Sequence, residues 1–339
     1  MECRREQVCL PQMPRRVFLA ITAGGLLAAR LAPGAQPAGQ VYRIGMLETR
    51  STVLNAANID AFRQGLLELG YKEGENFEIV YRSSDGRNER FPSLASELVR
   101  LRVDLILTRG TPAALAAKGA TRTIPVVMAA SADPVGSGLV ASLGRPGGNV
   151  TGLSSADIEV YAKRFELLRV MLPNLARIAA IFDMSNPVIP PQWHVVEATA
   201  RSLGIHAQLL DVRRPRDLGR AFDAAAQQRA EALIVGVGSI TQGNLRTIAD
   251  LAVKRRLPSI YGAKEYVDFG GLITYGASDP HMYRRAATFV DKIFKGAMPS
   301  DLPVEQPTTF ELVINLRTAK ALGLTIPPSL LQRADQVIE

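Results

Sequence analysis

The side chains that could perform catalytic chemistry are few and scattered in this chain. The three histidines, His194, His206 and His281, fall in separate predicted elements and lack the spacing of metal ligands. The sequence contains no G-x-S-x-G, P-loop or H-E-x-x-H motif, and no G-x-G-x-x-G follows the first predicted strand. We therefore expect no enzyme activity, no cofactor and no metal site, which leaves ligand binding as the chemistry to explain.

One turn has the features of a binding loop. The apolar run from Val103 to Leu107 has the length and β-branched content of a buried strand. A turn follows at Gly110, and a helical pattern begins behind Thr111, which suits the N-cap, and Pro112, which suits the first helical position. The free backbone N–H groups of such a helix start would stabilise a carboxylate beyond the carboxyl end of the strand. Taken alone, the turn could also be one ordinary connection among several.

The elements that must position this turn occur twice. From Tyr42 onward, short apolar runs alternate with helical patterns, which is typical of βαβ units around a parallel sheet. Arg43 lies 26 residues before Leu69, and Arg177 lies 26 residues before Leu203, so the register of the first unit returns in the second half. The sequence therefore predicts an α/β fold with two doubly wound, Rossmann-like lobes whose strand ends face a shared cleft.

The expected elements follow this alternation. Strands are predicted at 43–47, 78–81, 103–107, 123–128, 150–154, 178–182, 207–210, 233–237, 259–261 and 310–314. Helices are predicted at 59–69, 90–101, 112–117, 161–172, 193–203, 217–228, 243–254, 279–294 and 316–322.

The chain is expected to pass between the lobes three times. The densest turn signal, at 144–149, marks the first passage, and the segments after 276 are too short to form a third domain. We predict that residues 41–151 and 277–303 form the first lobe, and that residues 152–276 and 304–339 form the second. Crossings at 151–155, 275–278 and 304–307 would then act as a hinge.

Residues 1–40 have the features of an export signal that is removed. Arg15 and Arg16 form a twin-arginine pair before an apolar segment, 19–31, that is too short to span a bilayer, and Met13 would be a more usual start. Both cysteines, Cys3 and Cys9, fall in this part, so the mature chain has no disulfide, thiol nucleophile or thiolate zinc site. We predict a periplasmic protein exported by the twin-arginine route.

The positive charge does not indicate a nucleic-acid partner. Of the net charge of +8, residues 1–40 carry +3, from five arginines and two glutamates, which leaves +5 for the mature part. Basic residues are spread over the predicted helices without interleaved aromatic residues. Solvated helix faces explain them better, and we expect a monomer that binds no nucleic acid.

Several segments resemble a known family. These segments are FRQGL at 62–66, LGY at 69–71, GTPAA at 110–114, TIPVV at 123–127, DPVGSGLVASL at 133–143, RPGGNVTGL at 145–153, YRRAA at 283–287, and FELVIN at 310–315 with LGL at 322–324. Together they are similar to the ABC-transporter substrate-binding protein family that includes TrpX-like aromatic amino acid binders. The resemblance implies a type I periplasmic-binding-protein fold, a small-molecule ligand trapped between two lobes, and an ABC permease in the membrane as partner.

Within that fold, the ligand contacts are expected in the loops after the strand ends and at the crossings. Hydroxyl and backbone donors could hold a carboxylate, Asp133, Asn186 or Glu265 could take an ammonium group, and a tyrosine could cover an apolar part. Each could instead be a helix cap, a turn residue or part of the core. The predicted ligand-binding residues are Thr49, Arg109, Gly110, Thr111, Asp133, Ser154, Ser155, Asn186, Gly238, Ser239, Tyr261, Glu265 and Tyr275.

Arg109 departs from the family pattern, in which small residues stand before the glycine. It could pair with an anionic ligand or with a carboxylate of the second lobe, or it could point to solvent, and it puts an aromatic amino acid specificity in doubt. We interpret Trp193, the only tryptophan, as a packing residue. The favoured function is the solute-binding component of an ABC importer for an amino acid or another small carboxylate; the alternative is a ligand-sensing protein for a receptor or regulator.

Overall fold

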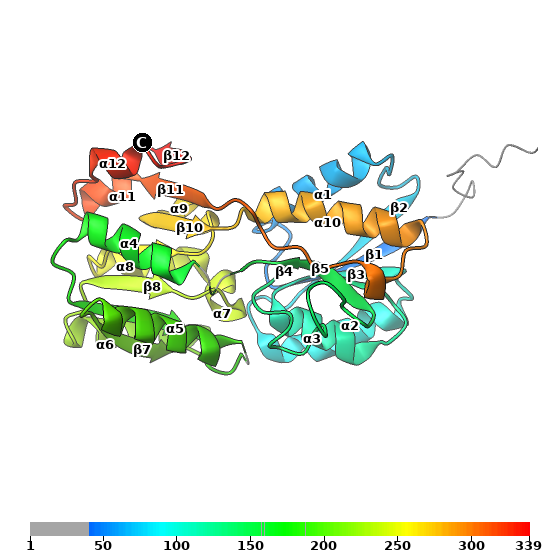
Figure 1. Ribbon diagram of the computed structural model, residues 1–339, viewed down its shortest axis with the longest axis horizontal. Coiled ribbons are helices and arrows are strands. Elements are labelled where there is room, and N and C mark those ends of the chain that lie inside the picture. Colours follow the sequence, from blue (N-terminus) through cyan, green and yellow to red (C-terminus); the bar gives the residue numbers. More distant parts are fainter. Residues whose placement is uncertain (1–40, 157, 159, 187) are drawn as a thin grey trace, which may run out of the picture. The chain divides into compact units, whose positions relative to one another are not determined.

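The computed structural model describes residues 41–156, 158, 160–186 and 188–339, and the predicted export signal lies outside these residues. Within them the chain forms two sheets that are covered by helices (Figure 1). Each sheet contributes side chains to two separate hydrophobic clusters, so each is packed on both of its faces. Lobe 1 is the part built around the five-stranded sheet, and lobe 2 is the part built around the seven-stranded sheet.

Lobe 1 holds the first five strands. They are β1 (Tyr42–Glu48), β2 (Phe77–Ser83), β3 (Leu105–Arg109), β4 (Val126–Ser131) and β5 (Val150–Ser154). All pairings are parallel, in the order β2-β1-β3-β4-β5. Every residue of β3, β4 and β5 is buried, as is expected of a parallel sheet that is covered on both faces. The carboxyl ends of these strands therefore lie at one edge, and the loops after them form one wall of the site.

Lobe 2 repeats this topology. Its strands are β6 (Arg177–Phe182), β7 (His206–Asp211), β8 (Ala232–Val235), β9 (Ser259–Tyr261), β10 (Ile273–Gly276), β11 (Glu311–Asn315) and β12 (Gln336–Ile338). The order β7-β6-β8-β9-β10 corresponds strand for strand to lobe 1, and β11 and β12 extend the edge beyond β10. β11 runs antiparallel to β10 because the chain enters it on its return from lobe 1. The predicted fold class of two doubly wound lobes is confirmed.

The helices follow the strands. They are α1 (Ala56–Glu68), α2 (Phe91–Arg100), α3 (Thr111–Ala120), α4 (Tyr161–Met171), α5 (Ile189–Ser202), α6 (Leu218–Gln227), α7 (Ser239–Gly243), α8 (Leu245–Lys254), α9 (Glu265–Asp268), α10 (Asp279–Phe294), α11 (Leu316–Ala321) and α12 (Pro328–Leu331). The sequence patterns did not predict α7, α9, α12, β10 and β12, which are all too short to show a hydrophobic period.

Two helices lie in the lobe opposite to the strand that precedes them. After β5 the chain continues to α4, which packs on α5 in lobe 2, and after β10 it continues to α10, which packs on α1 and β4 in lobe 1 (Figure 1). The approach of α10 to α1 is close, because a Cβ built on Gly65 would lie 2.7 Å from the carbonyl oxygen of Arg284. β5 stays in the sheet of lobe 1 as far as Ser154, so it runs through the predicted lobe boundary after Thr151.

Candidate ligand-binding site

A cavity of about 40 Å³ lies between the strand-end loops of the two lobes. Lobe 1 contributes the loops after β1, β3 and β4 and the first residue of α10, and lobe 2 contributes the loops after β6, β8 and β9. Ser155 and Ala277, from two of the crossings, also line the cavity. The lining residues are Thr49, Arg109, Gly110, Thr111, Pro112, Ala130, Ala132, Ser155, Asn186, Val188, Val237, Gly238, Ser239, Gln242, Gly262, Ala277 and Asp279. The walls are small or polar, and no described aromatic residue contributes to them.

The structure brings many of the predicted contacts to this cavity. Thr49, Arg109, Gly110, Thr111, Ser155, Asn186, Gly238 and Ser239 line it. In the opening turn of α3, Gly110 has φ of +85° and donates its N–H to the carbonyl of Ala130 at 2.8 Å. Thr111 is the first helical residue rather than the predicted N-cap, and its Oγ1 lies 3.0 Å from Oγ of Ser131. Gly238 opens α7 in lobe 2 as Gly110 opens α3, so the two turns face each other as the duplication predicts.

Five predicted contacts lie elsewhere. Asp133 accepts a hydrogen bond from the backbone N–H of Gly136 at 2.8 Å, so it has the capping role that was the alternative to ligand contact. Ser154 accepts a hydrogen bond at its Oγ from the N–H of Ala156 at 3.2 Å, and Glu265 is ion-paired. Tyr261 stacks on Tyr266, with ring centres 4.4 Å apart. The ring centre of Tyr275 lies 5.8 Å from that of Phe310. Trp193 packs against Phe182 in the core of lobe 2, which fits its interpretation as a packing residue.

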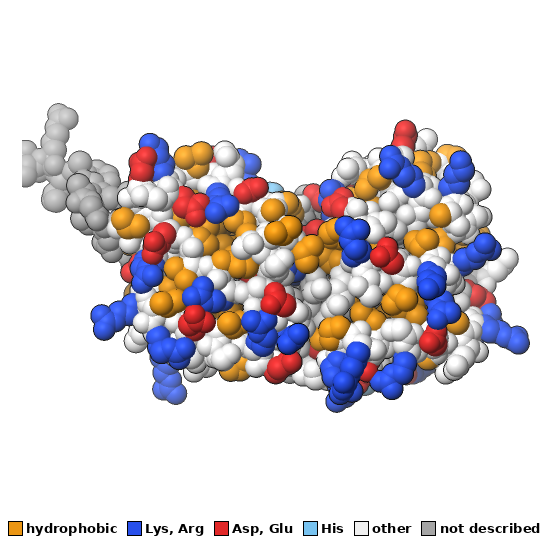
Figure 2. Space-filling model, turned by 180° about the vertical axis from the view of Figure 1, so that it is seen from behind, with side chains coloured by type: hydrophobic (Ala, Val, Ile, Leu, Met, Phe, Trp, Pro, Cys, Tyr) orange, Lys and Arg blue, Asp and Glu red, His pale blue; other side chains and the backbone are white. Residues whose placement is uncertain are grey.

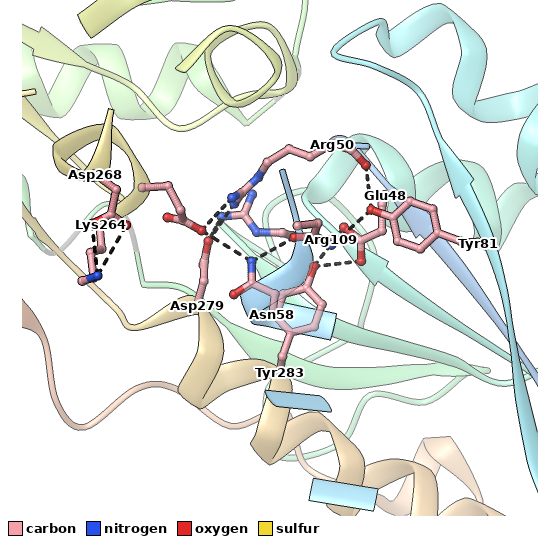
Figure 3. A network of polar contacts seen from close by, with 11 residues as sticks. Glu48, Arg50, Asn58, Tyr81, Arg109, Lys264, Asp268, Asp279 and Tyr283 are labelled. Carbon is pink, nitrogen blue, oxygen red and sulfur yellow. Dashed lines mark hydrogen bonds and ion pairs between the residues drawn. The ribbon is translucent and has the colours of Figure 1, made fainter. Parts of the chain in front are cut away.

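The lobe 1 wall is backed by a buried ion cluster that contains the predicted residues Arg109 and Glu265 together with Arg50 and Asp279, which were not predicted. Arg50, which is 1% exposed, donates from Nη2 to Oδ2 of Asp279 at 2.9 Å and from Nη1 to Oε1 of Glu265 at 2.6 Å (Figure 3). Arg109 pairs through its Nη2 with the same oxygen of Asp279. Asn58 also donates to Glu265, at 3.4 Å. Two guanidinium groups therefore face two carboxylates, and the cluster is close to neutral.

Arg109 does not point to solvent. It is 5% exposed, lines the cavity, and pairs with Asp279 of lobe 1 rather than with a carboxylate of lobe 2. The lobe 2 carboxylate Glu265 reaches Arg50 instead. Burial opposes the ionisation of Glu265, but Arg50 and Arg109 outweigh burial and lower the pKa of Glu265 to about 2. Glu265 is thus an anion that lobe 2 inserts among the cations of lobe 1.

Glu48 lies behind the cluster at the end of β1. Burial raises the pKa of Glu48 to about 7, although the hydroxyl of Tyr283 donates to both carboxylate oxygens, at 2.8 and 2.9 Å, and Arg109 and Arg50 lie nearby (Figure 3). No signal in the sequence could have found this pairing, because Glu48 and Tyr283 are 235 residues apart.

Two further contacts join the lobes beside the cavity. Asn88 of lobe 1 donates from Nδ2 to Oδ2 of Asp183 in lobe 2, at 2.9 Å. Gly86 of lobe 1 and Gly243 of lobe 2 touch through their backbones, and a Cβ added to Gly243 would lie 2.7 Å from Cα of Gly86. The lobes therefore meet so closely that only glycine fits at this point.

The surface outside the site is mixed in charge. On the face shown in Figure 2, acidic and basic side chains are interspersed over both lobes. Among the described residues, no helix has both the length and the apolar character needed to cross a bilayer. The same residues contain no group of three or more His, Cys, Asp or Glu side chains placed to hold a metal ion.

The chain has two repeated α/β lobes, three crossings between them and a polar cavity at the facing strand ends. This architecture is that of a solute-binding protein of the type I periplasmic class. Residues 52–338 match the family model for ABC transporter substrate binding proteins, and the chain belongs to that family. Its members bind a substrate and do not convert it, so the prediction of a binding protein rather than an enzyme is confirmed.

Known proteins similar to this chain agree with the family. A protein described as a tyrosine-binding protein from Clostridioides difficile (strain R20291) is 28% identical over 263 residues, which are 78% of this chain and 75% of that protein. A solved ABC domain in complex with L-Trp from Streptococcus pneumonia is 29% identical, with a TM-score of 0.81 over 88% of this chain and 100% of that one. A conserved domain protein from Vibrio cholerae gives a TM-score of 0.82 at 27% identity, over 87% and 99%.

Proposed function

We propose that this chain is the extracytoplasmic solute-binding component of an ABC importer that carries an α-amino acid or another small carboxylate. The observation that carries the proposal is the cavity whose walls come from the strand-end loops of both lobes and include the buried guanidinium of Arg109. A ligand held there touches both lobes, so it stabilises the form in which they meet. The permease would recognise that form.

The ligand class is supported by the site and by the relatives. One of the similar proteins reported above is described as a tyrosine-binding protein, and another was solved in complex with L-Trp. The described cavity walls offer hydroxyl, amide, guanidinium and carboxylate groups, which suit a charged amino and carboxyl group. They offer no aromatic surface, which favours a small or aliphatic side chain over an aromatic one. The predicted export signal supports a periplasmic location, where we expect the protein to act as a monomer.

A thermal-shift and calorimetry screen of the mature chain, residues 41–339, tests the ligand class. The panel contains the twenty standard L-amino acids, small carboxylates, sugars and nucleosides. At 100 times its Kd, a ligand that binds only the folded state adds about 2.7 kcal/mol to the free energy of unfolding. We expect this stabilisation from amino acids or small carboxylates. Stabilisation by sugars or nucleosides alone, or turnover of any bound compound, would contradict the proposal.

Uptake measurements test the importer role separately. Cells that lack the gene should accumulate less of the radiolabelled ligand found in the screen, and a plasmid copy should restore its uptake. The matched control is an unrelated amino acid that the purified protein does not bind, whose uptake should not change. Equal uptake of the ligand with and without the gene would refute the importer role and leave the binding result intact.

A further inference from the structure

Gln242 stands out on the lobe 2 wall because nothing in the described structure satisfies its amide. The residue is 1% exposed, lies on α7 and lines the cavity. Neither its Nε2 nor its Oε1 has a hydrogen-bond partner among the described residues. Its neighbour Thr241, in contrast, is engaged with the backbone: its hydroxyl lies 2.7 Å from the carbonyl oxygen of Gly236 and 3.0 Å from that of Gly238.

An unsatisfied amide at this position is costly. Each buried polar atom without a partner destabilises the folded state. Gln192, the other fully buried glutamine of lobe 2, accepts a hydrogen bond from the hydroxyl of Tyr161 at 3.0 Å and lies in the protein core. Gln242 differs because both of its polar atoms are unsatisfied and because it borders a cavity. A ligand in the cavity can satisfy both atoms, provided that it offers an acceptor to Nε2 and a donor to Oε1.

The opposite wall restricts the charge of such a ligand. Arg109 and Asp279 both line the cavity from lobe 1 and pair with each other. Arg50 and Glu265 complete a cluster of two cations and two anions. A ligand with a net negative charge would find no uncompensated cation in this cluster, whereas a zwitterion can place its ammonium group toward Asp279 and its carboxylate toward Arg109. A head group with one positive and one negative charge matches both walls.

We propose that Gln242 is the lobe 2 residue that recognises the zwitterionic amino-carboxylate head of the ligand, with Nε2 donating to the carboxylate and Oε1 accepting from the ammonium group. This inference rests on the proposed function and makes it more specific. It predicts that the protein selects the head group rather than a particular side chain, and that simple carboxylates and amines bind weakly.

The test uses calorimetry at pH 6 with the mature chain and its variants. The probes are the twenty L-amino acids and, for the one that binds most tightly, its methyl ester and the acid that lacks the amino group. Gln242→Leu keeps a similar volume without the amide, and Gln242→Glu keeps the acceptor but places a negative charge against the carboxylate. Gln228→Leu, at an exposed position of lobe 2, is the matched control.

We expect the wild type to prefer the amino acid to both analogues. Gln242→Leu should weaken amino acid binding by about 30-fold or more, because two hydrogen bonds to charged groups are lost, and the preference over the analogues should shrink. Gln242→Glu should bind the ester better than the amino acid, and Gln228→Leu should behave like the wild type. Without ligand, Gln242→Leu should melt at or above the wild-type temperature, because it removes two unsatisfied atoms.

The outcomes separate the two proposals. If no amino acid or carboxylate binds the wild type, both fail. If the wild type binds an amino acid and Gln242→Leu binds it within threefold, only the role of Gln242 fails. If the deaminated acid binds the wild type as tightly as the amino acid, the carboxylate alone is recognised, and the zwitterion inference is overturned while the proposed function remains.

Discussion

The two lobes share one topology but present different chemistry at equivalent strand ends. At the end of β1, lobe 1 has Glu48 and Arg50, and at the end of β3 it has Arg109. At the equivalent ends in lobe 2, Asp183 follows β6, and the uncharged segment 236–238, Gly-Val-Gly, follows β8. The wall of lobe 1 is thus charged, and its two arginines pair with Asp279 of lobe 1 and Glu265 of lobe 2. The described residues of lobe 2 that line the cavity carry no charge.

This difference assigns different tasks to the two walls. In lobe 1, the carboxylate of Asp279 holds Arg50 and Arg109 in fixed positions, so the wall is preorganised before a ligand arrives. In lobe 2, the amide of Gln242 has no hydrogen-bond partner among the described residues, and the carboxylate of Glu265 pairs with Arg50 of lobe 1. A duplicated scaffold has therefore kept its framework while its two copies of the site diverged. Three changes to the chain test these separate roles.

The largest effect is expected from Asp279→Asn, which removes the carboxylate shared by two buried guanidinium groups. Breaking a buried ion pair by removing one partner costs about 3–5 kcal/mol, because a charge is left uncompensated. The free energy of unfolding, measured with urea, should fall by that amount. Asp60→Asn is the control: Asp60 is 71% exposed and pairs with Arg63 at 3.4 Å, so a change below about 1 kcal/mol is expected. Equal stability of Asp279→Asn and the wild type would rule out a preorganised charged wall in lobe 1.

The second effect is a pH dependence above pH 4.5 that arises from Glu48 in lobe 1. Because the pKa of Glu48 is raised from 4.5 to about 7, the folded chain keeps a proton that the unfolded chain releases. The stabilisation is complete below pH 4.5 and is lost as the pH rises through about 7, in total about 3 kcal/mol at 1.36 kcal/mol per pKa unit. The lowered pKa of Glu265 acts in the opposite direction, but only as the pH falls from 4.5 toward 2.

Urea unfolding between pH 5 and pH 8 isolates the contribution of Glu48. Its surroundings are Tyr283, Arg109, Arg50 and Asp279, all from lobe 1. Glu48→Gln carries no charge at any pH, so its stability should decline less than that of the wild type over this range. If both proteins lose the same free energy between pH 5 and pH 8, Glu48 is not the titrating group.

The framework of both lobes could be predicted because alternating apolar runs and helical periods are local properties of the sequence. The spacing of 26 residues from Arg43 to Leu69, which recurs from Arg177 to Leu203, already indicated the topology shared by β1 and β6. The short helices α7 and α9 could not be predicted, because four or five residues show no period. Their absence from the prediction matters, since α7 carries Gln242 and α9 carries Glu265.

The predicted order of the strands indicated where the site lies, but it did not indicate which side chains of the site form ion pairs. Parallel strands bring their carboxyl ends to one edge, so Thr111 and Ser239 lie where the strand order predicted. No local pattern indicates that Arg50 meets Asp279, which is 229 residues away. Tyr261 shows the same limit, because a strand-end residue can face the cavity or the core, and here it lies in the core against Tyr266.

The third and smallest effect concerns the contact that brings the two walls together. Gly243→Ala places a methyl group 2.7 Å from the backbone of Gly86, a distance that Cβ atoms essentially never show. Gly243 does not have a positive φ, so alanine is compatible with its own backbone, and lobe 2 should fold normally. Because the lobes can no longer approach fully, ligand affinity should fall about tenfold, which is about 1.4 kcal/mol.

Calorimetry with the tightest-binding amino acid measures this loss, and small-angle scattering measures the compaction that the ligand causes. Gly219→Ala on α6 is the matched control, because a Cβ there meets nothing within 4 Å and the backbone φ is ordinary. We expect the control to compact on ligand addition as the wild type does, and Gly243→Ala to compact less. Unchanged affinity and compaction in Gly243→Ala would mean that the bound form does not need Gly86 and Gly243 in contact, and that the ligand bridges the charged and the neutral wall at a wider separation.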